Sequence, residues 1–187
     1  QNKDIYPIKF TDRVMSKGRK SLDAGCGLGR LVRHYHNAGH RISGCDYSQI
    51  AVDKLNKSNP ELDIRYGNLI DLPYDDDEFD NIFVMGGFHS IEDLSDLDKA
   101  VKETVRCLKV GGYLVAEARA DTLENQLIDF ISSKGGPKGN KFHKWCFKED
   151  EIIRILKKQP LDIERCEYIT NYPFLYKFQI FREMKNS

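Results

Sequence analysis

Residues 21–30 combine an acid with alternating glycines, in the order Ser-Leu-Asp-Ala-Gly-Cys-Gly-Leu-Gly-Arg. A short apolar run ends at Asp23, and the glycines follow at positions 25, 27 and 29. Glycines packed this closely after a strand let the backbone approach a ligand where a Cβ atom would collide. A phosphate group gains nothing from a fixed carboxylate at this place, whereas a cationic ligand does. The spacing therefore predicts a loop that holds a positively charged ligand.

A second acid, Asp46, follows the next predicted strand and lies 23 residues after Asp23. An acid at this place can accept hydrogen bonds from both hydroxyl groups of a ribose, so a cofactor that contains a nucleoside is expected. A dinucleotide would require the pattern G-x-G-x-x-G, with its third glycine at the position of Arg30. S-adenosylmethionine carries a sulfonium and an ammonium and no phosphate. The two acids therefore favour S-adenosylmethionine over a nicotinamide dinucleotide.

The composition fits one globular domain over residues 1–187. Lysine plus arginine and aspartate plus glutamate each number 29, so no overall field directs the chain to nucleic acid or to an anionic membrane. The five cysteines form no Cys-x-x-Cys pair, which favours free thiols in a reducing cytosol and hence a cytoplasmic protein. We expect no membrane span, because no run of about 18 apolar residues occurs.

Apolar periodicity predicts strands and helices that alternate along the chain. The predicted strands cover residues 19–24, 41–45, 62–66, 79–85, 113–116, 161–169 and 174–183. The predicted helices cover residues 28–38, 49–58, 94–108, 122–132 and 148–158. Ser48 is the expected N-cap of the second helix, and Gly111-Gly112 is expected to end the third. This order predicts an α/β fold with a mostly parallel sheet, an antiparallel C-terminal hairpin and ligands beyond the carboxyl ends of the strands.

Several motifs resemble one family, the class I S-adenosylmethionine-dependent methyltransferases. Residues 22–29 resemble its first motif. Residues 67–74, followed by Phe79-Asp80, resemble the third-strand loop and fourth strand of the small-molecule-type, methyltransferase type 11-like members. Residues 108–114 resemble the motif that precedes the fifth strand. The resemblance covers residues 18–120 with the motifs in order, and it implies a Rossmann-like, doubly wound seven-stranded sheet with the order 3-2-1-4-5-7-6.

The resemblance implies S-adenosylmethionine as cofactor and S-adenosylhomocysteine as its product. The implied cofactor residues all follow a predicted strand; they are Asp23, Ala24, Gly25, Cys26, Gly27, Gly29, Asp46, Tyr47, Ser48, Asn68, Leu69, Met85 and Gly86. Asp23 and the backbone of residues 25–29 would hold the methionine part, and Asp46 the ribose. Asn68 and Leu69 would meet the adenine. Asn68 stands where many relatives have aspartate, and it also suits an ordinary turn; its amide can accept and donate hydrogen bonds.

Methyl transfer is an in-line displacement at carbon, so alignment can supply most of the catalysis, and a base is needed only if the acceptor must lose a proton. His89, just past the predicted fourth strand, is the first candidate base, and His143 is the second. His89 also suits a pocket-lining or surface position. Phe88 and Trp145 could face a cation through their rings. We expect no metal, because His143 and Cys146 have ligand spacing but lack two further ligands nearby.

The acceptor is expected to be a small molecule methylated on oxygen, nitrogen or carbon, bound by a monomer or a homodimer. Residues 1–17 would be the remnant of an N-terminal lid, and residues 119–147 a substrate lid. The second segment mixes aromatic residues with lysines, which keeps tRNA or another macromolecule as an alternative acceptor. These lysines are Lys134, Lys138, Lys141 and Lys144. A further alternative is a domain that binds the cofactor without catalysis and acts as a partner.

Overall fold

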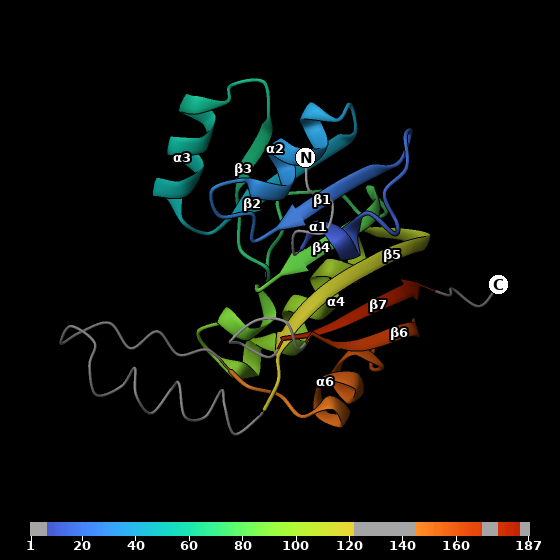
Figure 1. Ribbon diagram of the computed structural model, residues 1–187. Helices are drawn as coiled ribbons and strands as arrows, with labels where there is room; N and C mark the ends of the chain where they lie inside the picture. Colours follow the sequence, from blue (N-terminus) through green and yellow to red (C-terminus); the bar gives the residue numbers. More distant parts are fainter. Residues whose placement is uncertain (1–6, 122–144, 170–175, 184–187) are drawn as a thin grey trace.

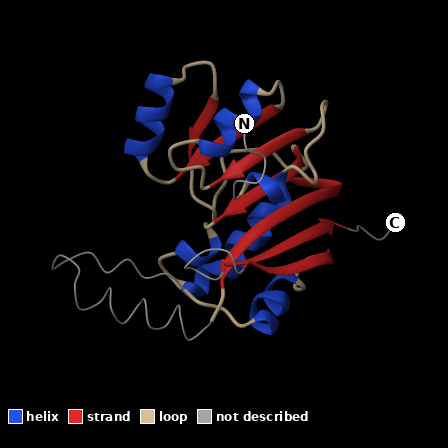
Figure 2. Ribbon diagram, viewed as in Figure 1, coloured by secondary structure: helices blue, strands red, loops and turns tan. Residues whose placement is uncertain are grey.

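A computed structural model describes residues 7–121, 145–169 and 176–183, which form a seven-stranded sheet with helices on both faces (Figures 1 and 2). The strands are β1 (Lys20–Ala24), β2 (Arg41–Asp46), β3 (Asp63–Tyr66), β4 (Phe79–Met85), β5 (Leu108–Arg119), β6 (Leu161–Ile169) and β7 (Tyr176–Glu183). Their order is β3-β2-β1-β4-β5-β7-β6. The pairings among β1 to β5 are parallel, and β7 is antiparallel to both neighbours. The predicted fold, strand order and antiparallel hairpin are confirmed.

Two hydrophobic cores lie on opposite faces of the sheet. The helices are α1 (Ile8–Thr11), α2 (Arg30–Asn37), α3 (Gln49–Ser58), α4 (Leu97–Cys107) and α6 (Glu149–Leu156), with 3₁₀ turns η1 (Phe88–Ser90) and η2 (Leu94–Asp96). Neighbouring strand residues point to opposite faces, so Phe83 joins the core under α1, α2 and α3, while Ile82 and Val84 join the core under α4 and α6. The sheet is therefore covered on both sides, as a doubly wound fold requires.

The junction between α4 and β5 differs from the prediction. Gly111-Gly112 was expected to end a helix, but α4 ends at Cys107 and β5 begins at once with Leu108. The ladder pairs Phe79 with Leu108 and then Asn81 with Tyr113, so the glycines lie in a bulge within the strand. Gly111 has a φ of 75°, and a Cβ atom at Gly112 would approach the Asp80 carbonyl oxygen to 2.9 Å. The bulge, rather than the helix end, requires these glycines.

The N-terminal segment contributes to the core over α2. Ile8 and Phe10 of α1 are buried in this core. Thr11 and the Tyr35 hydroxyl are hydrogen-bonded at 2.5 Å, and the same hydroxyl donates to Asp12 at 2.9 Å. This part of the predicted lid 1–17 therefore packs on the sheet. Residues 1–6, the predicted helix over 122–132 and most of the predicted lid 119–147 lie outside the described residues.

Candidate functional site

A cavity of about 450 Å³ opens at the carboxyl ends of the parallel strands. Parallel strands bring their carboxyl ends to one edge, so residues far apart in the chain meet there. The lining residues are Gly25, Cys45, Asp46, Tyr47, Gly67, Asn68, Leu69, Ile70, Met85, Gly86, Gly87, Ser90, Ile91, Glu92 and Asp96. The predicted cofactor residues that line it are Gly25, Asp46, Tyr47, Asn68, Leu69, Met85 and Gly86. The remaining predicted cofactor residues are not among the lining residues; they are Asp23, Ala24, Cys26, Gly27, Gly29 and Ser48.

Asp23 is a buried acid at the end of β1, with 3% of its surface exposed. Burial and, to a smaller extent, the charge of Asp46 raise its pKa to about 7, against the opposing effect of Arg30. The described residues donate no hydrogen bond to its carboxylate. A buried carboxylate without a donor is costly to ionise, and a nearby cation would lower that cost. The arrangement therefore suits a cationic ligand.

The glycine loop is held against β2 by backbone amides. The amides of Gly25 and Cys26 both donate to the Cys45 carbonyl oxygen at 2.9 Å. Gly25, Gly27 and Gly29 all have positive φ, between 53° and 83°. At Gly29, where α2 begins, a Cβ atom would lie 2.6 Å from the side chain of Leu55. Sterics as well as conformation thus require glycine at position 29.

Asp46 links the glycine loop to α3. One carboxylate oxygen accepts the Gly27 amide at 2.7 Å, and the other accepts the Ser48 amide at 2.9 Å. Ser48 in turn caps α3 through a bond from the Ala51 amide at 3.4 Å, so the predicted N-cap is confirmed. An ionised carboxylate has lone pairs for further donors. Asp46 can therefore brace the loop and still accept hydroxyl groups from a ligand.

Two further predicted site residues, Ala24 and Cys26, pack without lining the cavity. Ala24 is fully buried. Cys26 is 8% exposed, and its sulfur lies 3.0 Å from where a Cβ atom on Gly44 would be. Burial raises the pKa of the Cys26 thiol far above its ordinary value, so the thiol stays neutral. Both side chains fill space beneath the loop.

The opposite wall of the cavity comes from the loop after β3. The Asn68 side-chain oxygen accepts the Ile70 amide at 3.3 Å, and the Asp71 amide donates to the Asn68 carbonyl at 3.0 Å. Asn68 is thus a turn residue that also lines the cavity. The Leu69 side chain lies 2.7 Å from where a Cβ atom on Gly87 would be, so glycine at 87 leaves room for it.

The histidine and aromatic candidates lie behind the lining or outside the described residues. His89 is 2% exposed and is not among the lining residues. Its ring atoms Cε1 and Nε2 lie 3.6 and 3.7 Å from where a Cβ atom on Gly86 would be. The suggestion that Phe88 faces a cation is wrong, because Phe88 is fully buried in the core under α4. Trp145 contacts the cavity wall, donating its indole N–H to the Ile91 carbonyl at 2.7 Å. His143 lies outside the described residues.

Sequence reasoning missed two buried charged residues at the end of β5, Glu117 and Arg119, which are 4% and 3% exposed. Glu117 pairs with Met85 across the β4–β5 ladder, at the same sheet edge as the cavity. A signal was available, since two charges alternate with Ala116 and Ala118 in an otherwise apolar strand. Apart from Gly86, sequence reasoning did not assign the lining residues after β4, which lie in and between the 3₁₀ turns η1 and η2 or just before them: Gly87, Ser90, Ile91, Glu92 and Asp96.

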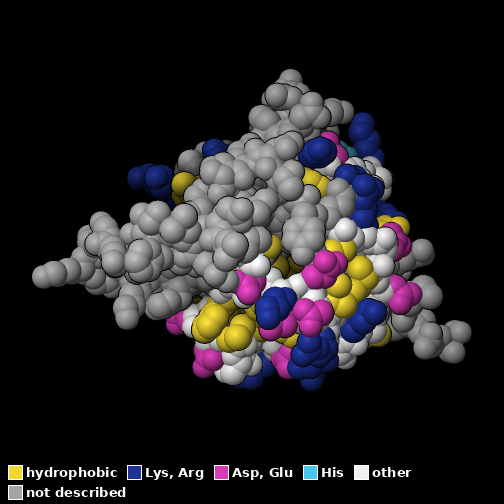
Figure 3. All heavy atoms as spheres, turned by 60° about the horizontal axis from the view of Figure 1, so that its bottom comes forward, with side chains coloured by type: hydrophobic (Ala, Val, Ile, Leu, Met, Phe, Trp, Pro, Cys, Tyr) yellow, Lys and Arg dark blue, Asp and Glu magenta, His cyan; other side chains and the backbone are white. Residues whose placement is uncertain are grey.

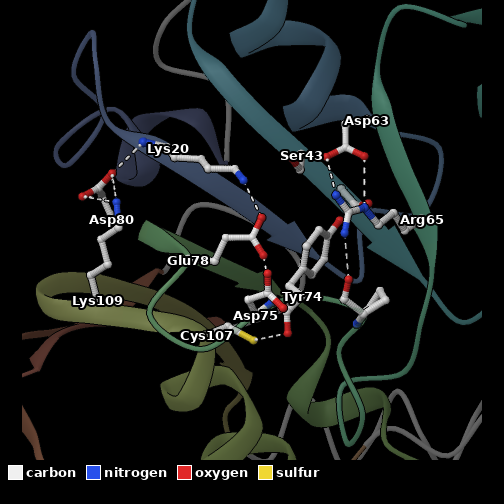
Figure 4. A network of polar contacts seen from close by, with 12 residues as sticks. Lys20, Ser43, Asp63, Arg65, Tyr74, Asp75, Glu78, Asp80, Cys107 and Lys109 are labelled. Carbon is white, nitrogen blue, oxygen red and sulfur yellow. Dashed lines mark hydrogen bonds and ion pairs between the residues drawn. The ribbon is translucent and has the colours of Figure 1, made fainter.

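The acidic run 75–78 forms ion pairs with the surrounding elements. Glu78 pairs with Lys20, and Asp76 pairs with Arg106 at 2.6 Å (Figure 4 shows the Lys20–Glu78 contact). Within the described residues no three metal-ligating side chains gather. On the described part of the face that carries α6, acidic and basic side chains are interleaved (Figure 3). Within α6, Arg154 and Asp150 form an ion pair at 3.0 Å. No helix in the described part of the chain is long and apolar enough to cross a membrane.

Residues 22–116, just over half of the chain, match the family model for a methyltransferase domain. The chain belongs to the class I S-adenosylmethionine-dependent methyltransferases. It is 32% identical over 148 residues to a protein of Mycolicibacterium smegmatis named "Probable S-adenosylmethionine-dependent methyltransferase". The matched residues make up 79% of this chain and 53% of that protein. The chain thus spans about half the length of this relative. The cofactor of the family is S-adenosylmethionine, as the two acids and the glycine loop predicted.

Two other similarities extend over more of the chain. A ubiquinone biosynthesis O-methyltransferase of Pelagibacter ubique is 28% identical over 171 residues, which is 87% of this chain and 69% of that protein. The solved structure of an S-adenosylmethionine-dependent methyltransferase from Methanosarcina mazei matches with a TM-score of 0.83 at 20% identity, covering 98% of this chain and all of that one. The structural match shows a shared fold over nearly the whole chain.

Proposed function

We propose that this chain transfers a methyl group from S-adenosylmethionine to a small-molecule acceptor. The observation that carries the proposal is Asp23, a buried carboxylate that receives no hydrogen bond from the described residues, beside a glycine loop and a cavity of about 450 Å³. The sulfonium and the ammonium of the cofactor are positive groups that would stabilise the ionised form of this carboxylate. The glycine loop leaves space for a methionine chain to lie along the backbone.

The remaining lining residues fit the other parts of the cofactor. Asp46 has spare acceptor capacity for the ribose hydroxyl groups. Asn68 and Leu69 offer a polar and an apolar surface to the adenine, and Tyr47, 59% exposed, is available to cover it from the other side. The backbone at Met85 would meet the methionine amine. Each role matches the chemistry of the residue that would perform it.

The cofactor supplies a methyl group activated by its sulfonium. The chain would supply position, because the edge of the sheet would orient the two ligands relative to each other. His89 and His143 stay proposals for a base, which only some acceptors need. His89 would have to act from behind Gly86, and this makes it a weaker proposal than its sequence position suggests.

A small acceptor is favoured over RNA for two reasons. The relative from Pelagibacter ubique is named as an O-methyltransferase of ubiquinone biosynthesis. The chain carries 29 basic and 29 acidic residues, whereas a protein that binds RNA commonly has an excess of basic residues. The lysine-rich stretch that suggested RNA lies outside the described residues.

Calorimetry with S-adenosylmethionine and S-adenosylhomocysteine tests the proposal directly. We expect both to bind with a dissociation constant below about 0.1 mM. An acceptor panel with a radiolabelled methyl donor then separates an enzyme from a binding partner. No heat at millimolar ligand would sink the proposal, and binding without transfer to any acceptor would favour the inactive partner domain.

A further inference from the structure

The loop between β3 and β4 covers residues 67–78, and its first residues line the cavity. Its later residues contact α4 and the sheet instead. The lining part is a short turn, residues 68–71, closed by the hydrogen bond from Asp71 to Asn68. Leu69 and Ile70 of this turn pack against the core under α4 and α6. The orientation of the turn therefore depends on this packing and on what holds the residues on either side of it.

On the α4 side the anchor is a charged pair, Glu103 and Arg106. Glu103 accepts the Leu72 amide at 2.9 Å. Arg106 donates to the Tyr74 carbonyl at 2.9 Å and to the Leu72 carbonyl at 3.3 Å. The two side chains also bind each other in a bidentate pair, at 2.6 and 2.9 Å. The backbone at Leu72 and Tyr74 is thus held by one rigid pair of α4 residues.

On the sheet side the anchor is Tyr74. Its hydroxyl donates to the Gly44 carbonyl at 2.9 Å. Arg65 lies over its ring at 4.4 Å (Figure 4). Arg65 also donates to the Pro73 carbonyl at 2.9 Å. Pro73 packs so closely on Gly67 that a Cβ atom there would lie 2.5 Å from the proline ring. The loop is therefore closed at its base by contacts from both sides.

The charges of Glu103 and Arg106 allow the two side chains to hold the loop backbone. The hydrogen bonds that Arg106 donates to Glu103 lower the pKa of Glu103 and raise that of Arg106, so both side chains stay ionised. Two backbone carbonyls and the Asp76 carboxylate all point to the same guanidinium. A planar fork of donors can satisfy them together, which a lysine cannot do.

We propose that Glu103 and Arg106 are positioning residues for adenine recognition: they fix the base of the 68–71 turn, and thereby the place of Asn68 and Leu69. This inference rests on the proposed function, since it takes the ligand of that turn to be an adenine. Neither residue is among those that line the cavity. Their effect on the ligand is exerted through the loop backbone.

The test compares S-adenosylhomocysteine with S-inosylhomocysteine, which differs only in the base. We expect Arg106→Met to weaken S-adenosylhomocysteine binding about tenfold in calorimetry, while S-inosylhomocysteine changes by less than about twofold. The preference for adenine would thus be lost. Arg106→Lys keeps one donor and should give an intermediate preference. Arg154→Met on α6, which breaks an exposed ion pair at 3.0 Å, is the matched control and should change neither constant.

The outcomes distinguish a positioning role from a purely structural role and from a failure of the proposed function. A lower melting temperature of Arg106→Met with an unchanged preference for adenine would overturn the proposal and leave a structural role only. If Arg106→Met does not fold, Glu103→Gln and Tyr74→Phe test the same loop more gently, and an unchanged preference in both would count against it. If the wild type binds neither ligand, the proposed function fails instead.

Discussion

The cavity has two differently built edges. At the β1–β2 edge, Asp46 accepts hydrogen bonds from the amides of Gly27 and Ser48, so these contacts stay within residues 27–48. At the β4–β5 edge, contacts join distant segments: the Trp145 amide donates to the His89 carbonyl at 2.9 Å, and Glu117 stands beside Met85. The first edge is specified by local sequence, and the second by packing. The first edge therefore suits the cofactor, which is the same throughout the family, and the second edge suits an acceptor that differs between family members.

The largest expected effect comes from Gly29, whose substitution would break the local edge. Gly29→Ala forces a side chain into positive φ and into contact with Leu55, so we expect a loss of about 3 kcal/mol in unfolding free energy. Gly39 has a φ of 81° but no neighbour within 4 Å. Gly39→Ala should therefore cost only about 1 kcal/mol. Equal losses of unfolding free energy for the two variants, measured by urea titration, would show that the Leu55 side chain moves aside and that only the backbone conformation matters.

Removing the charge of Asp23 should affect the ligand more than the fold. Asp23→Asn is expected to raise the dissociation constant for S-adenosylmethionine about a hundredfold, because a buried carboxylate no longer faces the cation. Its melting temperature at pH 8 should not fall, since the ionised carboxylate is itself costly to bury. Calorimetry and thermal melts measure the two effects. A wild-type affinity would mean that the carboxylate is not used by the ligand.

The affinity should also depend on pH through the same group. Asp23 has a pKa of about 7 in the ligand-free chain, and a cation favours its ionised form. The dissociation constant should therefore be flat above pH 7 and rise by up to about tenfold per pH unit below it. Asp23→Asn should remove this slope, and an identical slope in that variant would assign it to another group.

The linked effect on stability has a defined sign. The folded-state pKa of Asp23 is raised above its ordinary value of 3.8, so the folded chain binds the proton more tightly than the unfolded chain. The stabilisation from this proton is present below about pH 4 and is lost as the pH rises towards 7. The ligand-free wild type should therefore lose stability relative to Asp23→Asn across that interval.

The smallest expected effect lies at the packed edge. Trp145→Phe removes the indole donor to Ile91 but keeps the backbone bond to His89, so we expect about 1 kcal/mol lower stability. S-adenosylhomocysteine should bind within about twofold of the wild type, because the Asp23 and Asp46 edge is untouched. Chemical denaturation and calorimetry check both values. A large loss of cofactor affinity would remove the distinction between the two edges.

The same distinction explains what could be predicted from sequence. The strands, their order and the glycine loop follow from local patterns and from the family resemblance, and they are confirmed. The position of His89 behind Gly86 depends on how η1 packs, and the placement of Gly111-Gly112 depends on a ladder with β4. Neither is visible in a window of neighbouring residues. Glu117 and Arg119 gave a local signal, but only the register with Met85 relates them to the cavity.

Trp145 is the single tryptophan of the chain, and its indole is hydrogen-bonded to Ile91 in the cavity wall. The tryptophan fluorescence of the chain therefore originates from one residue at the packed edge. Indole emission shifts when its N–H bond or its exposure to water changes. Occupancy of the cavity can thus be followed optically in the unlabelled protein, which allows acceptor libraries to be screened by emission wavelength before any product is known.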